Sequence, residues 1–142
     1  MATIKTFEDI ESWKKAREVC KILGRYIDEG KFKKSFRLVN QIEGSSGSIM
    51  DNIAEGFERG TRAEFITFLG YSKGSCGELR SQLYRAFDRN YISEKEFEDL
   101  KIFVLQISGL IQNFISYLQK SEVAGVRKKV AIKKPYTLNL KL

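Results

Sequence analysis

The chain of 142 residues contains no histidine, only one proline and only two cysteines. Without histidine there can be no Ser-His-Asp or Cys-His catalytic set, and no imidazole-ligated zinc or di-iron site. Cys20 and Cys76 are too few for a disulfide framework or an all-cysteine zinc site. We therefore expect a protein without catalytic residues, metal or cofactor. Chemistry that uses carboxylates alone is the alternative that these absences leave open.

The sequence is also poor in helix breakers and in long apolar runs. Pro135 is the single proline, so almost the whole chain is free to be helical. The N-terminal stretch MATIKTFEDIESW has no apolar run long enough for a secretory signal or a membrane span. Hydrophobic residues make up 42% and charged residues 30%, as in an ordinary soluble domain. These features predict one helical, cytoplasmic domain.

Three segments begin with a helix-capping pattern and continue with apolar residues at helical spacing. The pattern of Thr or Ser followed three residues later by Asp or Glu occurs at Thr6, Thr61 and Ser93. Gly30 stands where the first helix should end, so this helix is predicted from Thr6 to Gly30. The predicted core stripes are Trp13, Ala16, Cys20, Leu23 and Ile27 in the first helix, Phe65, Phe68, Leu69, Ser72, Cys76, Leu79, Leu83 and Phe87 in the third, and Phe97, Leu100, Val104, Ile107, Ile111, Phe114 and Leu118 in the fourth.

Residues 41–56, QIEGSSGSIMDNIAEG, have a first half with the composition of a flexible linker. A linker has no reason to keep the helical period, yet apolar and small residues keep it across the whole stretch. The residues in phase are Leu38, Ile42, Ser45 or Ser46, Ile49, Ile53 and Phe57. We therefore predict a second helix that runs through two interior glycines, which makes residues 1–121 an all-α bundle of four helices.

Glycines recur on the face opposite the predicted core in two of the helices. These are Gly44 and Gly47 in the second helix and Gly70, Gly74 and Gly77 in the third. Ile102 and Leu105 point away from the main stripe of the fourth. The simpler interpretation is that glycine is tolerated on an exposed face. Because three helices share an unusual outer face, we favour the hypothesis that it forms subunit contacts in an oligomer.

Positive charge is concentrated in two regions. Residues 122–142 are predicted to be a basic tail, flexible or extended, because residues 123–142 hold six Lys or Arg and no acid, which is +6 of the net +7. Residues 14–37 hold nine Lys or Arg and three acids. Such clusters are either solvated surface or a track for nucleic-acid phosphates. The candidate nucleic-acid-binding residues are Lys14, Arg17, Lys21, Arg25, Lys33, Lys34, Arg127, Lys128 and Lys129.

Three motifs resemble a known family. They are NIAEG at residues 52–56, EFITFLGYSKGSCGEL at 64–79, and FEDIESWKKA at 7–16. They are similar to bacterial four-helix-bundle proteins named after members encoded in intervening sequences of large-subunit ribosomal RNA genes. The resemblance covers residues 7 to about 120. It implies an up-down-up-down antiparallel bundle, a five-membered ring and a role around RNA, with no catalytic residues. A distant relative, the accessory protein of diversity-generating retroelements, implies a partner protein such as a reverse transcriptase.

Two other functions compete with RNA or DNA binding. Glu94, Glu96, Glu98 and Asp99 make the start of the fourth helix acidic, so head-to-tail contact with the basic first helix would build a protein scaffold without nucleic acid. Alternatively, the tail could contact an anionic membrane. We favour an oligomer that recognises the shape and backbone of nucleic acid, since no set of aromatic residues forms a platform for single strands.

Overall fold

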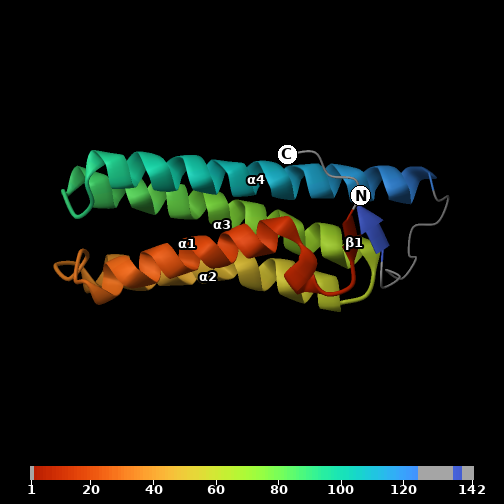
Figure 1. Ribbon diagram of the computed structural model, residues 1–142, viewed down its shortest axis with the longest axis horizontal. Helices are drawn as coiled ribbons and strands as arrows, with labels where there is room; N and C mark the ends of the chain where they lie inside the picture. The colour runs from red at the N-terminus through yellow and green to blue at the C-terminus, as the bar shows by residue number, and fades with distance from the viewer. Residues whose placement is uncertain (1, 125–135, 139–142) are drawn as a thin grey trace.

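The computed structural model describes residues 2–124 and 136–138. In chain order its elements are strand β1 (Ala2–Ile4), the 3-10 helix η1 (Phe7–Asp9), helices α1 (Glu11–Asp28), α2 (Phe36–Glu58), α3 (Arg62–Asp88) and α4 (Glu94–Ala124), and strand β2 (Tyr136–Leu138). The four helices lie along one long axis and alternate in direction (Figure 1). The α1–α2 and α3–α4 connections share one end of the bundle, which we call the loop end. The predicted all-α, up-down-up-down bundle is confirmed.

The first helix begins later than predicted. Residues 7–9 form η1 instead, and Ile10 is extended (φ −78°, ψ 123°), so α1 begins at Glu11. The predicted pair of Thr6 and Asp9 serves η1, where the Asp9 carboxylate accepts hydrogen bonds from the backbone N–H groups of Lys5 (2.8 Å) and Thr6 (3.1 Å). These bonds lower the pKa of Asp9. The caps at Thr61 and Ser93 are as predicted, whereas α1 ends at Asp28, two residues before the predicted end, and Gly30 follows with a positive φ of 82°.

The two strands bring the ends of the chain together. β1 pairs with β2 in an antiparallel ladder, with Ala2 opposite Leu138 and Ile4 opposite Tyr136. Ile4 is buried in the core. β2 lies within the segment predicted to be extended. Its pairing with β1 is a contact between distant parts of the chain, which local sequence patterns do not reveal.

The core stripes of α2 and α4 match the prediction residue by residue, whereas that of α1 is rotated. Ser12, Ala16, Val19 and Leu23 are the buried residues of α1. The predicted core residues Trp13, Cys20 and Ile27 are only partly buried. The shift is about 50° on a helical wheel. The large Trp13 ring packs at the edge of the core against Phe7, with ring centroids 5.2 Å apart.

Helices α2 and α3 meet along a seam of small polar side chains. The Ser72 hydroxyl donates to the Ile49 carbonyl (2.7 Å), and Ser75 donates to the Ser48 hydroxyl (3.0 Å). Ser45 in turn donates to the buried Gln82 side chain (2.5 Å). Ser45 and Ser48 of the linker-like stretch therefore bind the neighbouring helix, and the helical interpretation of residues 41–56 is confirmed.

The two helices approach each other closely at Gly56, in the NIAEG motif. A Cβ atom on Gly56 would lie 2.6 Å from the Cβ of Phe68 and 3.1 Å from a ring carbon of Phe65. No side chain fits there without moving the backbone of α2 or α3. The neighbouring rings of Phe57, Phe65 and Phe114 then pack edge to face across α2, α3 and α4 (5.8 and 5.0 Å between centroids).

Helix α4 is long and apolar enough over Glu94–Ser121 to cross a membrane by length and composition. Core helices of soluble proteins satisfy the same criteria. Its apolar stripe from Phe97 to Leu118 is buried within the bundle. Core packing is therefore sufficient to explain its composition.

We predict that Gly56→Ala destabilises the fold by about 1–3 kcal/mol, because the added methyl group overpacks the α2–α3 contact. The matched control is Gly109→Ala in α4, where an added Cβ meets no described atom within 4 Å. This change should stabilise the helix by about 0.5–1 kcal/mol. Urea unfolding followed by circular dichroism measures both. Equal effects of the two substitutions would contradict the close approach at Gly56.

A second prediction concerns Glu96, which accepts a bond from the Ser93 backbone N–H (2.8 Å) and forms an ion pair with Lys31 (3.0 Å). The Ser93 bond first, and then Lys31, hold the pKa of Glu96 below its ordinary value of 4.5. A depressed pKa contributes stability above the unfolded-state pKa, and this contribution is lost as the pH falls through the folded-state pKa.

Glu96→Gln keeps a side-chain acceptor for Ser93 and removes the charge. We expect the free energy of unfolding of the parent to exceed that of Glu96→Gln above about pH 5 and the difference to shrink at lower pH. Denaturant unfolding at several pH values measures this. A difference that does not depend on pH would show that the carboxylate charge plays no part.

Candidate nucleic-acid interface

The four basic residues predicted on the first helix lie on the outer face of α1. Lys14, Arg17, Lys21 and Arg25 are all exposed. They lie opposite the core face of α1 formed by Ala16, Val19 and Leu23. Ion pairs with residues one turn earlier offset part of their charge: Lys14 contacts Glu11 and Lys21 contacts Glu18, both at 3.3 Å. The Arg17 guanidinium lies 5.9 Å from the Trp13 ring.

The loop from α1 to α2 is fixed to the bundle on both sides. The side chain of Phe32 is fully buried and lies edge to face with Tyr91 of the other connection, with centroids 6.4 Å apart. The Lys31 ammonium forms its 3.0 Å ion pair with Glu96 of α4, a contact that raises the pKa of Lys31. Lys31 therefore serves the fold, and the remaining cations of this loop stand on a well-supported backbone.

Four cations at the loop end have no ion pair within the described residues: Arg25, Lys33, Lys34 and Arg37. All four are exposed. They come from the end of α1, the connection and the start of α2, which the fold brings to one end of the molecule (Figure 1). We call this set the loop-end cations. Asp28 and Glu29 are the acids within residues 25–37, so positive charge predominates in this segment, while the acidic start of α4 lies at the same end of the bundle.

Phe36 lies among the loop-end cations and is 78% exposed, the highest value among the exposed large hydrophobic residues. Sequence reasoning missed it because position 36 is out of phase with the stripe that starts at Leu38. The available signal was an aromatic residue inside the basic run KFKKSFR.

The remaining predicted basic residues cannot be placed beside this surface. Arg127, Lys128 and Lys129 lie outside the described residues. The chain leaves α4 at Ala124 and is described again at Tyr136, in β2 at the end of the bundle away from the loops (Figure 1). Of the nine candidate residues, the fold brings Arg25, Lys33 and Lys34 together at the loop end, and it places Lys14, Arg17 and Lys21 along α1.

Four of the five glycines predicted for subunit contacts lie on the outer faces of α2 and α3, whereas Gly47 lines a pocket between α1 and α2 with Cys20 and Ile27. Gly44, Gly70, Gly74 and Gly77 are exposed and Gly47 is half-buried. A Cβ atom on any of the five would meet no described atom within 4 Å. Large apolar side chains are exposed on α3 and α4 as well, namely Tyr71, Tyr84, Ile102 and Leu105. The outer surface of a single chain is therefore unusually smooth on two helices and apolar on two.

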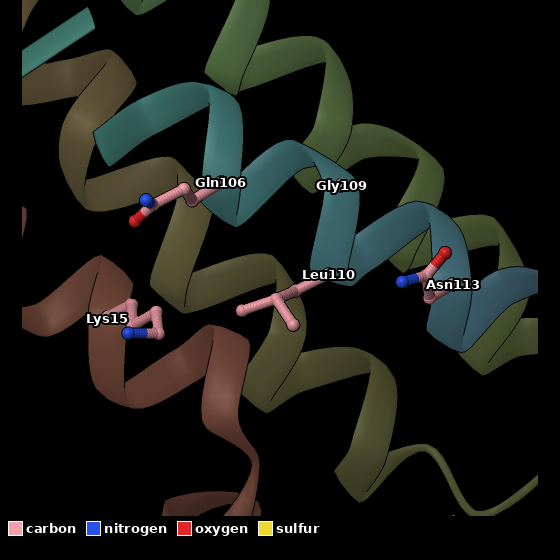
Figure 2. Close-up of a pocket in the computed structure, with 5 residues that line it drawn as sticks. All are labelled: Lys15, Gln106, Gly109, Leu110 and Asn113. Atoms are coloured by element: carbon pink, nitrogen blue, oxygen red, sulfur yellow. The ribbon is translucent and has the colours of Figure 1, made fainter. Parts of the chain in front are cut away.

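A half-open pocket of about 340 Å³ lies between α1 and α4. Figure 2 shows Lys15 of α1 facing Gln106, Leu110 and Asn113 of α4, with Gly109 on the same wall. The Lys15 ammonium also lies 5.8 Å from the Phe103 ring. Among the described residues, its lining provides two side-chain amides, the Lys15 amine and an apolar wall, and no carboxylate or thiol.

The carboxylate of the NIAEG motif and the two thiols have structural surroundings. Glu55 forms an ion pair with Arg59 (2.8 Å). Burial raises the pKa of the Cys76 thiol to about 12 and also raises that of the partly buried Cys20. The Asn52 amide donates to the carbonyl and the hydroxyl of Ser48 in its own helix (both 2.8 Å). The described residues contain no group of His, Cys, Asp and Glu that could hold a metal ion.

The acidic start of α4 and the basic end of α1 lie at the same end of the bundle, and they meet within one chain through Lys31 and Glu96. This pair is therefore already satisfied within the subunit. The geometry does not require a neighbouring molecule for it, which weakens the head-to-tail arrangement considered from the sequence.

Comparisons with known proteins agree with this fold. The family model described as 23S rRNA-intervening sequence protein matches residues 8–113. The chain is also similar to the crystal structure of a protein of unknown function from the S23 ribosomal protein family of Bacteroides thetaiotaomicron VPI-5482. The two are 25% identical with a TM-score of 0.68, over 73% of this chain and 97% of that one. No curated protein matches. Since the family model matches most of the sequence and the fold agrees with that of the structural relative, the chain belongs to the 23S rRNA-intervening sequence protein family.

Proposed function

We propose that this protein is a non-enzymatic, oligomeric RNA- or DNA-binding protein that contacts the phosphate backbone through its loop-end cations. The observation that carries the proposal is the exposure of Arg25, Lys33, Lys34 and Arg37 without ion pairs among the described residues. Lys and Arg side chains without an ion pair in the protein can pair with phosphates, and this releases counterions from the nucleic acid and favours binding. The family description and the ribosomal name of the structural relative support RNA as the ligand.

The family and the structural relative also point to a non-catalytic protein. Cys76 is buried in the core, Cys20 is partly buried, and the Glu55 carboxylate of the NIAEG motif forms an ion pair with Arg59. We place the protein in the cytoplasm, where RNA is available to it. The resemblance of its motifs suggests a five-membered ring, and several copies of a weak site would then add through effective concentration.

A protein scaffold without nucleic acid is the second candidate. The exposed apolar residues Tyr71, Tyr84, Ile102 and Leu105 favour it, because outward apolar groups of this size are typical of protein contacts. The two functions differ in one measurable property. Binding to a phosphate backbone weakens steeply with salt, and a scaffold has no affinity for nucleic acid at all.

The first test replaces three loop-end cations together, in Lys33→Ala/Lys34→Ala/Arg37→Ala. We expect weaker binding to RNA and a plot of log affinity against log salt that is flatter by about two units, since each lost phosphate contact removes about 0.7–0.9. Fluorescence anisotropy with labelled RNA at several salt concentrations measures this. The control, Arg62→Ala/Lys73→Ala/Lys120→Ala, removes the same charge elsewhere on α3 and α4.

Equal losses in both triple variants would mean that only net charge matters, and the loop-end site would be wrong. Truncation after Glu122 tests the tail in the same assay and also removes β2. If the tail carries the main contacts, truncation flattens the salt dependence more than the triple substitution does. A parent protein that binds no RNA or DNA would leave the scaffold as the better account.

The second test concerns the outer face of α3. If Gly74 lies in a subunit contact, Gly74→Leu should give smaller particles in sedimentation velocity while helicity is retained, because the new side chain holds the subunits apart. Lys73→Leu is the control, since it places the same side chain at the adjacent exposed position about 100° away on the helix. Unchanged assembly in Gly74→Leu would rule out the glycine face as the interface.

A further inference from the structure

Phe36 and Phe32 are four residues apart and have opposite environments. Phe32 is fully buried, whereas Phe36, the first residue of α2, is 78% exposed. A single exposed apolar side chain is common on protein surfaces. The surroundings of this one are not, because three of the four loop-end cations are within three residues of it in the sequence: Lys33, Lys34 and Arg37.

The backbone that presents the Phe36 ring is held by consecutive hydrogen bonds. The Lys33 N–H donates to Gly30 (3.2 Å), and the Ser35 N–H donates to Phe32 (2.9 Å). The Ser35 hydroxyl accepts from the Leu38 N–H (3.2 Å) and caps α2. With Phe32 anchored in the core, the backbone that carries Phe36 is already ordered, so only the side chain has to be ordered when a flat partner binds.

The electrostatics around Phe36 favour a negatively charged partner. The first turn of α2 contains no acidic residue, so its N-terminal dipole is not neutralised there. Lys33 and Lys34 precede the ring, Arg37 follows it, and all are exposed. A ligand that combines a flat aromatic group with anionic groups on either side fits this arrangement. An unpaired nucleotide within a nucleic-acid strand has that composition.

We propose that Phe36 is a stacking platform for an unpaired base, with Lys33, Lys34 and Arg37 on the flanking phosphates. The proposal rests on the proposed function and specifies its ligand as single-stranded RNA or DNA, including loops and ends. Bases within a duplex are already stacked on each other and cannot cover the ring. Stacking is tolerant of sequence because every base has a π face, so the site selects strandedness without reading bases.

The experiment compares a labelled 12-nucleotide single-stranded RNA with the same RNA as a duplex, by fluorescence anisotropy. Phe36→Ala should weaken single-strand binding about fivefold or more. Binding to the duplex and the slope of the salt dependence should stay as in the parent, because no phosphate contact is removed. Phe36→Leu, which keeps apolar bulk without a π face, should behave like Phe36→Ala, and Phe36→Trp should restore binding.

Tyr71→Ala is the matched control, since Tyr71 is 58% exposed on α3 outside the loop end. The proposal is overturned if Phe36→Ala or Phe36→Leu binds single strands as tightly as the parent does. It is also overturned if Tyr71→Ala weakens single-strand binding as much as Phe36→Ala does, or if Phe36→Ala changes the particle size in sedimentation. This last result would assign the ring to a subunit contact. If the Lys33/Lys34/Arg37 variant loses binding while Phe36→Ala does not, stacking fails and the phosphate-binding function stands. If the parent protein binds neither the single-stranded RNA nor the duplex, both the stacking proposal and the proposed function are overturned.

Discussion

The close contact between α2 and α3 is the constraint on which the rest of the bundle depends. The helices approach closely because Gly56 leaves room for Phe65 and Phe68, and because Ser72 and Ser75 bond across the contact. The seam accounts for part of the linker-like composition of residues 43–48, since Ser45 and Ser48 also bond across the contact. Fixing α2 against α3 also sets where Phe57, Phe65 and Phe114 meet, and so where α4 packs.

The charges of the surface follow from the same arrangement. Helix α1 turns its Ala16–Val19–Leu23 face inward, so its basic residues lie on the far side, where neighbouring glutamates partly neutralise them. At the loop end, Lys31 is used to tie the first connection to α4, and Phe32 anchors it in the core. The remaining cations of the connection gain a rigid support and no partner among the described residues. A structural contact thereby creates the surface to which we assign function.

Much of this fold could be predicted from the sequence, for identifiable reasons. The apolar stripes of α2 and α4 are unbroken, so the helical period located these two helices. The caps at Thr61 and Ser93 involve residues three positions apart, so the sequence also indicated where α3 and α4 begin. The face of α1 was placed wrongly because Trp13 and Ile27 were assumed to lie at its centre, whereas the smaller Ser12 and Val19 do. The strand pair joins residues more than 130 positions apart, and no local signal indicates such a contact. The ion pairs of Lys14 and Lys21 could have been read from their spacing to Glu11 and Glu18. That the loop-end cations have no ion pair among the described residues could be learned only from the three-dimensional structure.

The β1–β2 ladder has a geometric consequence for any long ligand. It anchors the far side of the basic segment at the end of the bundle away from the loops, where α4 also stops. Helix α4 has 31 residues, which corresponds to about 46 Å. One strand of a B-form duplex rises about 3.4 Å per nucleotide and covers this length in about 14 nucleotides. Under the proposed function, a nucleic acid that contacts both the loop end and the opposite end of one subunit would have to extend over about this length.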